Sequence, residues 1–297
     1  MPRIVVATSD GLHALDERGT TEPVQHAGRQ VTAVMRDGPQ LWAIIDGGQI
    51  WHAPDAEWRE IARLEGIEAT CLAMTDAVYV GTSEARLFRL TGTELEPVAG
   101  FDRAEGRADW FTPWGGPPAV RSFAEWDEDV FVNVHVGGIL RTSDHGHSWS
   151  PTIDIDADVH QVAITEDLVL AACAGGLATS TDRGSTWTMR RDGLDAPYAR
   201  AVVVSGDTVL VSASRGPRGG RAAVYRGDIR GGALERRTTE WLDDNIDTYC
   251  LDALNDGSFA AFGTSDGRLF ASDDGGSNWR EIASGLPAVR HVLVVPA

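Results

Sequence analysis

Short apolar runs alternate with turn-forming residues from one end of the chain to the other. The runs are about four to eight residues long and end at Gly, Asp or a small polar residue, which predicts β-strands. Seven runs read as the second strand of a repeated unit: Ile4–Thr8, Leu41–Ile45, Val78–Thr82, Val130–Val136, Val169–Ala174, Val209–Ser214 and Phe259–Thr264. Most are followed by a short third strand, as at Leu87–Leu90, Ile139–Thr142, Leu177–Ser180 and Leu269–Ala271.

A further strand is predicted before each of the six later runs and once more at the C-terminus, so these strands again number seven. They are Gln30–Met35, Ala69–Met74, Arg121–Trp126, His160–Ile164, Arg200–Val204, Tyr249–Leu254 and Arg290–Val295. The last one has no second strand after it, whereas the N-terminus begins with a second strand and has no first. The simplest solution places the C-terminal strand in the sheet begun by the N-terminus, which closes the array without free edges. The sequence therefore predicts an all-β fold, a seven-bladed β-propeller forming a single domain over residues 1–297.

Three copies of one motif, (S/T)-x-D-x-G-x-x-W, lie at Thr142–Trp149, Ser180–Trp187 and Ser272–Trp279. The pattern predicts a tight hairpin: the Asp carboxylate accepts hydrogen bonds from turn amides, Gly adopts a left-handed backbone, and Trp folds over the turn. Repetition of one supersecondary unit is typical of propellers and other arrays.

These motifs resemble the Asp-box (BNR) repeat of sialidases, sortilin-type receptors and photosystem II assembly-factor-like proteins. The longer pattern from His135–Arg141 through the first motif to Asp158–Val162 resembles bacterial BNR-repeat glycosyl hydrolase or exo-sialidase-like proteins. The resemblance implies the propeller scaffold, with structural Asp boxes. It does not imply the sialidase reaction, because sialidases have six blades and no Glu can be paired with a Tyr nucleophile here.

Two surplus connections interrupt the repeat. The longer insertion, residues 105–118, contains Trp110 and Trp114, and the shorter is Ser214–Arg221. Long loops in a tight repeat are more often functional than other connections, and both are expected at the mouth of the central channel. The two tryptophans either cover a ligand or pack on the third blade, and the sequence leaves both interpretations open.

The first strands of a propeller line its channel, and one aligned position reads Arg290, Val31, Thr70, Arg121, His160, Arg200 and Tyr249 in blade order. Arginines that converge on an enclosed space need an anion to offset their desolvation, and guanidinium groups bind carboxylate or phosphate bidentately. The alternative is a structural network in which they pair with acidic neighbours such as Glu68, Asp156, Asp158 or Asp247.

The candidate catalytic residues are His135, His160 and Tyr249; the candidate ligand-binding residues are Arg121, Arg200, Arg290, Trp110, Trp114 and Asn133. A histidine carries protons readily near neutral pH, although each of these two also suits a hydrogen-bonded core. Two histidines without a third ligand at a recognisable spacing do not predict a metal site, and no cofactor is expected.

The net charge of −18, from 26 basic and 44 acidic side chains, argues against nucleic-acid and anionic-membrane partners. The strand pattern begins at the N-terminus without a signal peptide or a long apolar stretch. Cys71, Cys173 and Cys250 are far apart and lie in apolar runs, so we expect buried, reduced thiols in a cytoplasmic protein.

Two functions are compatible with these patterns. The first is a cytoplasmic glycoside hydrolase-like enzyme, a hydrolase or lyase, that binds a small anionic, carboxylate-bearing molecule or sugar in an Arg-lined channel. The second is a non-catalytic propeller that binds a peptide or protein partner, as assembly factors do. A pair of carboxyl groups roughly 5–9.5 Å apart over the channel would favour glycoside hydrolysis.

Overall fold

The computed structural model describes residues 1–55, 57–113 and 115–297, and within them the protein is all-β. Trp114 lies outside the described residues. The helical segments are short: α1 (Ala99–Asp102) and the 3-10 turns η1 (Arg107–Asp109) and η2 (Ile155–Ala157). No described helix is long and apolar enough to cross a bilayer.

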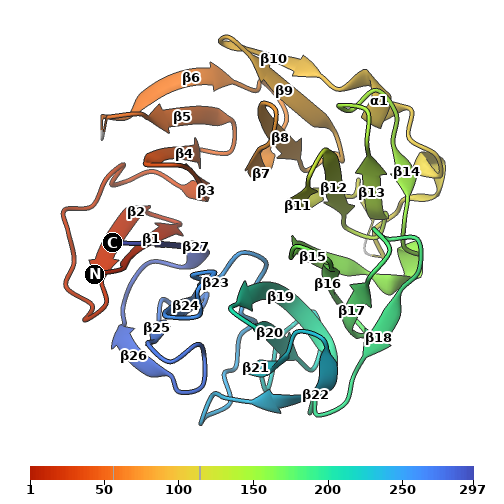
Figure 1. The fold of residues 1–297 in the computed structure, drawn as a ribbon. Helices are drawn as coiled ribbons and strands as arrows, with labels where there is room; N and C mark the ends of the chain where they lie inside the picture. The colour runs from red at the N-terminus through yellow and green to blue at the C-terminus, as the bar shows by residue number, and fades with distance from the viewer. Residues whose placement is uncertain (56, 114) are drawn as a thin grey trace. The chain divides into compact units, whose positions relative to one another are not determined.

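The strands form the seven sheets of a seven-bladed β-propeller (Figure 1). Six sheets have four strands each, in the orders β3-β4-β5-β6, β7-β8-β9-β10, β11-β12-β13-β14, β15-β16-β17-β18, β19-β20-β21-β22 and β23-β24-β25-β26. The strands of the first three are β3 (Val31–Asp37), β4 (Gln40–Ile45), β5 (Gln49–Ala53), β6 (Arg59–Arg63), β7 (Ala69–Met74), β8 (Val78–Thr82), β9 (Leu87–Thr91), β10 (Glu94–Pro97), β11 (Val120–Trp126), β12 (Asp129–Val134), β13 (Gly138–Thr142) and β14 (Ser150–Pro151).

The next three sheets follow the same order. Their strands are β15 (Val159–Ile164), β16 (Val169–Cys173), β17 (Gly176–Ser180), β18 (Thr188–Arg190), β19 (Tyr198–Ser205), β20 (Thr208–Ser214), β21 (Ala223–Asp228), β22 (Gly231–Arg236), β23 (Leu251–Ala253), β24 (Ala260–Gly263), β25 (Leu269–Ser272) and β26 (Arg280–Ala283). The predicted first and second strands are therefore present in every blade, with shifted ends in several.

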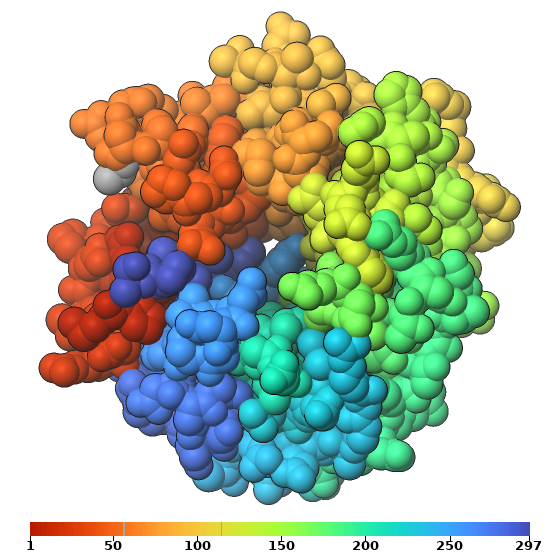
Figure 2. All heavy atoms as spheres, in the orientation of Figure 1, coloured from red at the N-terminus to blue at the C-terminus, as the bar shows by residue number. Residues whose placement is uncertain are grey.

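The seventh sheet joins the two ends of the chain, as predicted. β1 (Arg3–Thr8) pairs on one side with β2 (Gly11–Asp16) and on the other with β27 (Val289–Val295), both antiparallel. The last residues of the chain lie against the first in both views (Figures 1 and 2). This sheet has three strands, whereas each of the other six has four. Beyond β2, in place of a fourth strand, Gln25 and Thr21 form only isolated bridges to β2.

The chain divides into two compact units, each with its own core. Unit 1 comprises residues 1–31, 170–179 and 188–297, and its core includes Ile4, Phe259, Phe262 and Val292. Unit 2 comprises residues 32–169 and 180–187, and one of its clusters is built around Ile44, Ile50, Val80 and Phe88. The three cysteines are buried and free, and burial raises the pKa of the Cys71 thiol to about 12.

The three motif copies form hairpins of the predicted kind. Asp274 accepts hydrogen bonds from the backbone amide and the side-chain Nδ2 of Asn278, 2.9 and 2.7 Å away, and from the Ser272 hydroxyl. Gly276 has φ +81°, so a residue with a Cβ is strained there. In the first copy, Trp149 folds back and donates its Nε1–H to the Gly146 carbonyl. We call these segments the repeat hairpins.

Substitution Val292→Ala tests the closing sheet. Val292 is 1 % exposed and pairs with Val6, so the loss of two buried methyl groups should lower the free energy of unfolding by roughly 2 kcal/mol. Urea unfolding measures the difference. Val295→Ala, at the half-buried end of the same strand, should cost less, and equal losses would contradict this account of the packing.

Substitution Asp274→Asn tests the repeat hairpins. Burial alone would raise the pKa of Asp274, but the Asn278 and Ser272 donors outweigh it and lower the pKa below its ordinary value of 3.8. Because the native pKa is the lower one, the stabilisation is present above about pH 4 and is lost as the pH falls through the native pKa. The variant should be less stable by roughly 1 kcal/mol at neutral pH. The two melting temperatures should converge in acid, whereas Asp273→Asn should match the wild type throughout.

Candidate functional site

The two histidines that are predicted to be catalytic lie close to one carboxylate within unit 2. Oδ1 of Asp158 lies 3.3 Å from Nε2 of His135 and 3.6 Å from Nε2 of His160. The two imidazole rings are 5.8 Å apart between centroids. His160 is fully buried, His135 is 3 % exposed, and the Asp158 side chain is partly exposed. We call these three residues the His–Asp–His cluster.

Local backbone geometry brings the cluster together. The amide of His135 donates to the Ala119 carbonyl and extends the pairing of β12 beyond Val134, after which Val136 turns the chain with φ +49°. Asp158 ends η2 with φ +48° and directly precedes β15. Asp158 is therefore not part of an extended segment, and the contact of its Oδ1 with Nε2 of His160 comes from this turn rather than from strand alternation.

The charges around the cluster keep its carboxylate ionised. Burial alone would raise the pKa of Asp158, but the short contact with His135, the charges of His160 and His135 and, last in size, the charge of Arg121 together lower it. A predicted ligand-binding arginine therefore acts electrostatically on the same carboxylate that joins the two histidines.

Asn133 lies deeper on β12. It is fully buried, and neither its side-chain oxygen nor its nitrogen has a hydrogen-bond partner among the described residues. Asn133 pairs in register with Ser122, whose hydroxyl accepts from the amide of Val162 on β15. Cross-strand partners share a face of the sheet, so the side chain of Asn133 lies on the face of Ser122, toward β15. His135 is two residues further along and lies on the same face.

The 105–118 insertion contacts the same strand end. The amide of Phe111 donates to the Val136 carbonyl, and a Cβ on Gly137 would approach the Trp110 ring to 3.1 Å. Trp110 also lies against Phe101, with the Arg107 guanidinium 4.8 Å from its ring. Trp110 thus packs against Phe101 and near Gly137, two residues after His135.

In unit 1, Arg200 is held by protein groups. Its Nη1 lies 2.7 Å from Oδ1 of Asp247, and its Nη2 donates to the Pro217 carbonyl in the shorter insertion. Asp247 is one of the acidic partners that the sequence offered. The Arg200 side chain is 11 % exposed, so its charge is already largely offset.

Tyr249 is not a strand residue, which corrects the sequence prediction. It lies in a turn before β23 with φ +60°, a conformation that no alternating pattern reveals, and its ring stacks on His291 at 4.7 Å. Burial lowers the pKa of His291 to about 3. Arg290, on β27, is exposed. The convergence of Arg121, Arg200 and Arg290 on one ring stays a prediction.

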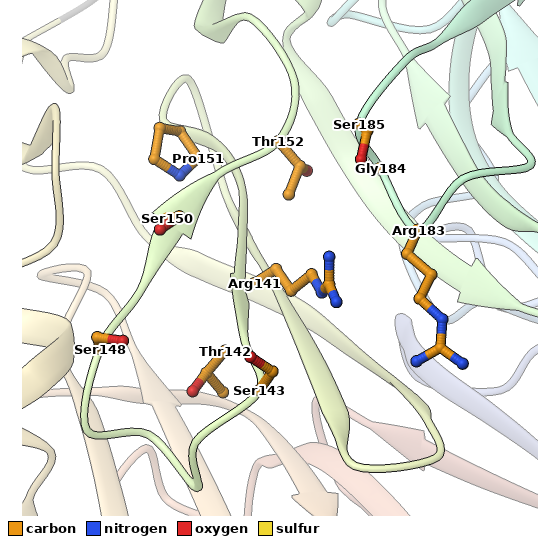
Figure 3. A pocket seen from close by; sticks show the side chains of 10 residues that line it. All are labelled: Arg141, Thr142, Ser143, Ser148, Ser150, Pro151, Thr152, Arg183, Gly184 and Ser185. Carbon is orange, nitrogen blue, oxygen red and sulfur yellow. The ribbon is translucent and has the colours of Figure 1, made fainter.

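A pocket of about 250 Å³ lies between two repeat hairpins of unit 2, and none of the predicted site residues lines it (Figure 3). Its wall carries Arg141, Arg183 and several serine and threonine hydroxyls. Both guanidinium groups bind the buried carboxylate of Asp129, at 2.9 and 2.7 Å, and Arg183 also binds Asp127. The positive charges of this pocket are therefore neutralised within the protein.

Asp158 is the residue that the sequence reasoning did not select. The sequence indicates Asp158 as a counter-ion for an arginine rather than as a partner of the histidines. The sequence signal is an acidic residue two positions before His160, and the left-handed turn at Asp158 leaves no periodic pattern.

Comparison with known proteins gives the fold. No protein-family model and no curated protein sequence matches the chain. Among solved structures, an ancestral GH74 enzyme is similar at 15 % identity and TM-score 0.65, over 95 % of this chain and 40 % of that one. YCF48 from Cyanidioschyzon merolae is similar at 14 % identity and TM-score 0.59, over 86 % of each chain.

A chain of the nidogen/laminin complex is similar at 10 % identity and TM-score 0.60, over 99 % of this chain and 98 % of that one. The chain spans only a third of the extracellular domain of the one-component system BT4673 from B. thetaiotaomicron, which is similar at 12 % identity and TM-score 0.61 over 84 % of this chain. At these identities the likeness defines a β-propeller and no reaction.

Substitution Asn133→Leu tests the polar character of the β12 face. A buried amide without protein partners costs roughly 1–3 kcal/mol, and Leu has a similar volume, so the variant should be more stable by about 1 kcal/mol or more. Thermal unfolding measures the change. Asn133→Asp, which adds a buried charge, should be less stable than the wild type, and a loss of stability in the Leu variant would show that the amide is engaged.

Proposed function

We propose that the protein is a hydrolase-like enzyme that acts on a small anionic molecule at the His–Asp–His cluster. The observation that carries this proposal is one ionised carboxylate placed between two buried imidazoles within the electrostatic reach of Arg121. Groups with perturbed protonation that gather at one point are typical of sites that move protons. The GH74 neighbour shares the fold and supports only the scaffold.

Each residue has a chemical task in this proposal. Arg121 binds the anionic group of the substrate, for which a guanidinium is suited by its paired donors. Asp158 orients the imidazoles and stabilises positive charge that develops on them, as a carboxylate does beside a catalytic histidine. The cluster accepts a proton from the attacking water and returns it to the leaving group, so the reaction consumes one water and no net proton.

The other predicted residues have lesser parts in this proposal. Arg200 is paired with Asp247 and is therefore a weaker anion ligand than Arg121. Trp110 packs beside Gly137 and would border a bound molecule near His135. Arg290, Tyr249, Asn133 and Trp114 remain candidates for contacts with the substrate.

A non-catalytic propeller that binds a peptide or protein is the second candidate. One observation that favours it is the likeness in fold to YCF48 and to a chain of a protein–protein complex, that of nidogen and laminin. The pairing of Arg200 with Asp247 also agrees with a structural role for part of the arginine set.

Chromogenic esters and glycosides, each with and without a carboxylate or phosphate group, test the proposed enzyme. The wild type should hydrolyse at least one anionic substrate faster than its neutral counterpart. His160→Asn should lower kcat by roughly 100-fold or more, because it removes the proton-handling group. Arg121→Gln should raise KM for the anionic substrate and leave the neutral one unchanged.

His145→Asn is the matched control, since His145 is an exposed hairpin residue at φ +57°, where Asn is well tolerated. Asp158 lies at a partly exposed position, so Asp158→Asn should lose activity without unfolding. Circular dichroism monitors the folding of this variant. No turnover of any substrate, or equal activity in the His145 and His160 variants, would overturn the enzyme and favour the scaffold.

A further inference from the structure

The geometry points to a divalent metal ion, of the zinc type, bound by His135, Asp158 and His160. This inference deepens the proposed function and rests on its site: a metal ion held by the cluster would itself activate the attacking water, in place of the imidazoles as proton acceptors. The sequence predicts no metal site, because its two histidines lack a third ligand. The fold supplies that ligand in Asp158.

The distances fit such an ion. The three potential ligand atoms, one from each residue, all lie within 4.8 Å of one another. Ligands bound tetrahedrally at about 2.0–2.1 Å from zinc are about 3.3 Å apart. The observed separations from Oδ1 of Asp158 are 3.3 Å to His135 and 3.6 Å to His160, so small side-chain movements would bring all three to coordination distance.

The donor set fits as well. Two imidazoles and one carboxylate are the ligands of open, three-coordinate protein sites in zinc enzymes, which leave a fourth position for water. Imidazole donors favour zinc and other first-row ions over magnesium and calcium, which prefer oxygen ligands. The three side chains come from the end of β12 and the start of β15, so the framework around the ion would be rigid.

The carboxylate oxygen supports coordination rather than a simple ion pair. Oδ1 of Asp158 is buried, and two imidazole nitrogens lie within 3.6 Å of it. A buried carboxylate oxygen normally accepts a hydrogen bond or binds a cation.

Charge does not oppose the ion. Arg121 is the only guanidinium among the groups that act on Asp158, and its effect is the smallest of them. The net charge of −18 attracts cations.

Equilibrium dialysis of metal-stripped protein against zinc chloride, with the metal measured by mass spectrometry, tests the inference. The wild type should bind one tight zinc ion per chain and melt at a higher temperature with zinc than without it. His160→Asn and Asp158→Asn should each weaken binding by roughly 100-fold or more, because loss of a direct ligand exceeds the loss from an outer-sphere partner. Cobalt(II) in place of zinc should give a visible absorption band that both variants lack.

The double variant His145→Asn/His147→Asn is the control for binding to exposed histidines, and it should retain the tight site. The inference is overturned if the wild type and the two cluster variants bind zinc equally, or if the wild type binds none. The outcome is separate from that of the proposed function. Tight zinc binding without turnover would support the metal site and overturn the proposed enzyme. Arg121-dependent turnover by metal-stripped protein would support the enzyme and overturn the role of the metal.

Discussion

The pairing of β1 with β27 is the constraint on which the rest of the structure depends. The chain starts with the middle strand of a blade, so the neighbouring strand of that blade comes from the other end of the sequence. Arg3 opposite Val295 is among the longest-range contacts the chain can make. Contacts at such separation form late because they carry a large loop-closure entropy. In return, both edges of β1 are covered and neither is left open to aggregation.

The His–Asp–His cluster shows how this scaffold accommodates polar groups that a core would exclude. Strand ends carry the groups, because there the backbone leaves the regular ladder and takes left-handed turns, as Val136 and Asp158 do. A buried carboxylate is tolerated only with positive or hydrogen-bonding neighbours. His135, His160 and Arg121 provide them for the partly exposed carboxylate of Asp158.

The sequence predicted the blades, the closure and the repeat hairpins because all three depend on local patterns: alternation along a strand, Gly and Asp in turns, and an unmatched strand at each end. It did not predict Asp158 as a histidine partner or the turn at Tyr249, because single left-handed residues redirect a side chain without changing any periodic pattern. Asp247 was one of several acidic residues that the sequence left open as partners of Arg200. Only tertiary packing brings residues so far apart in the sequence into contact. The missing fourth strand of the closing sheet reflects a polar segment after β2 that offers only isolated bridges.

The seventh sheet also determines how the protein responds to force. Because β1 and β27 are antiparallel, Arg3 and Val295 lie side by side at the same end of the sheet. A pull on the two chain ends therefore loads the hydrogen bonds of this pair one after another, as in opening a zipper, rather than all together in shear. The strand pair that completes the fold is thus a mechanical weak point. A force applied to the two chain ends would separate β1 from β27 first.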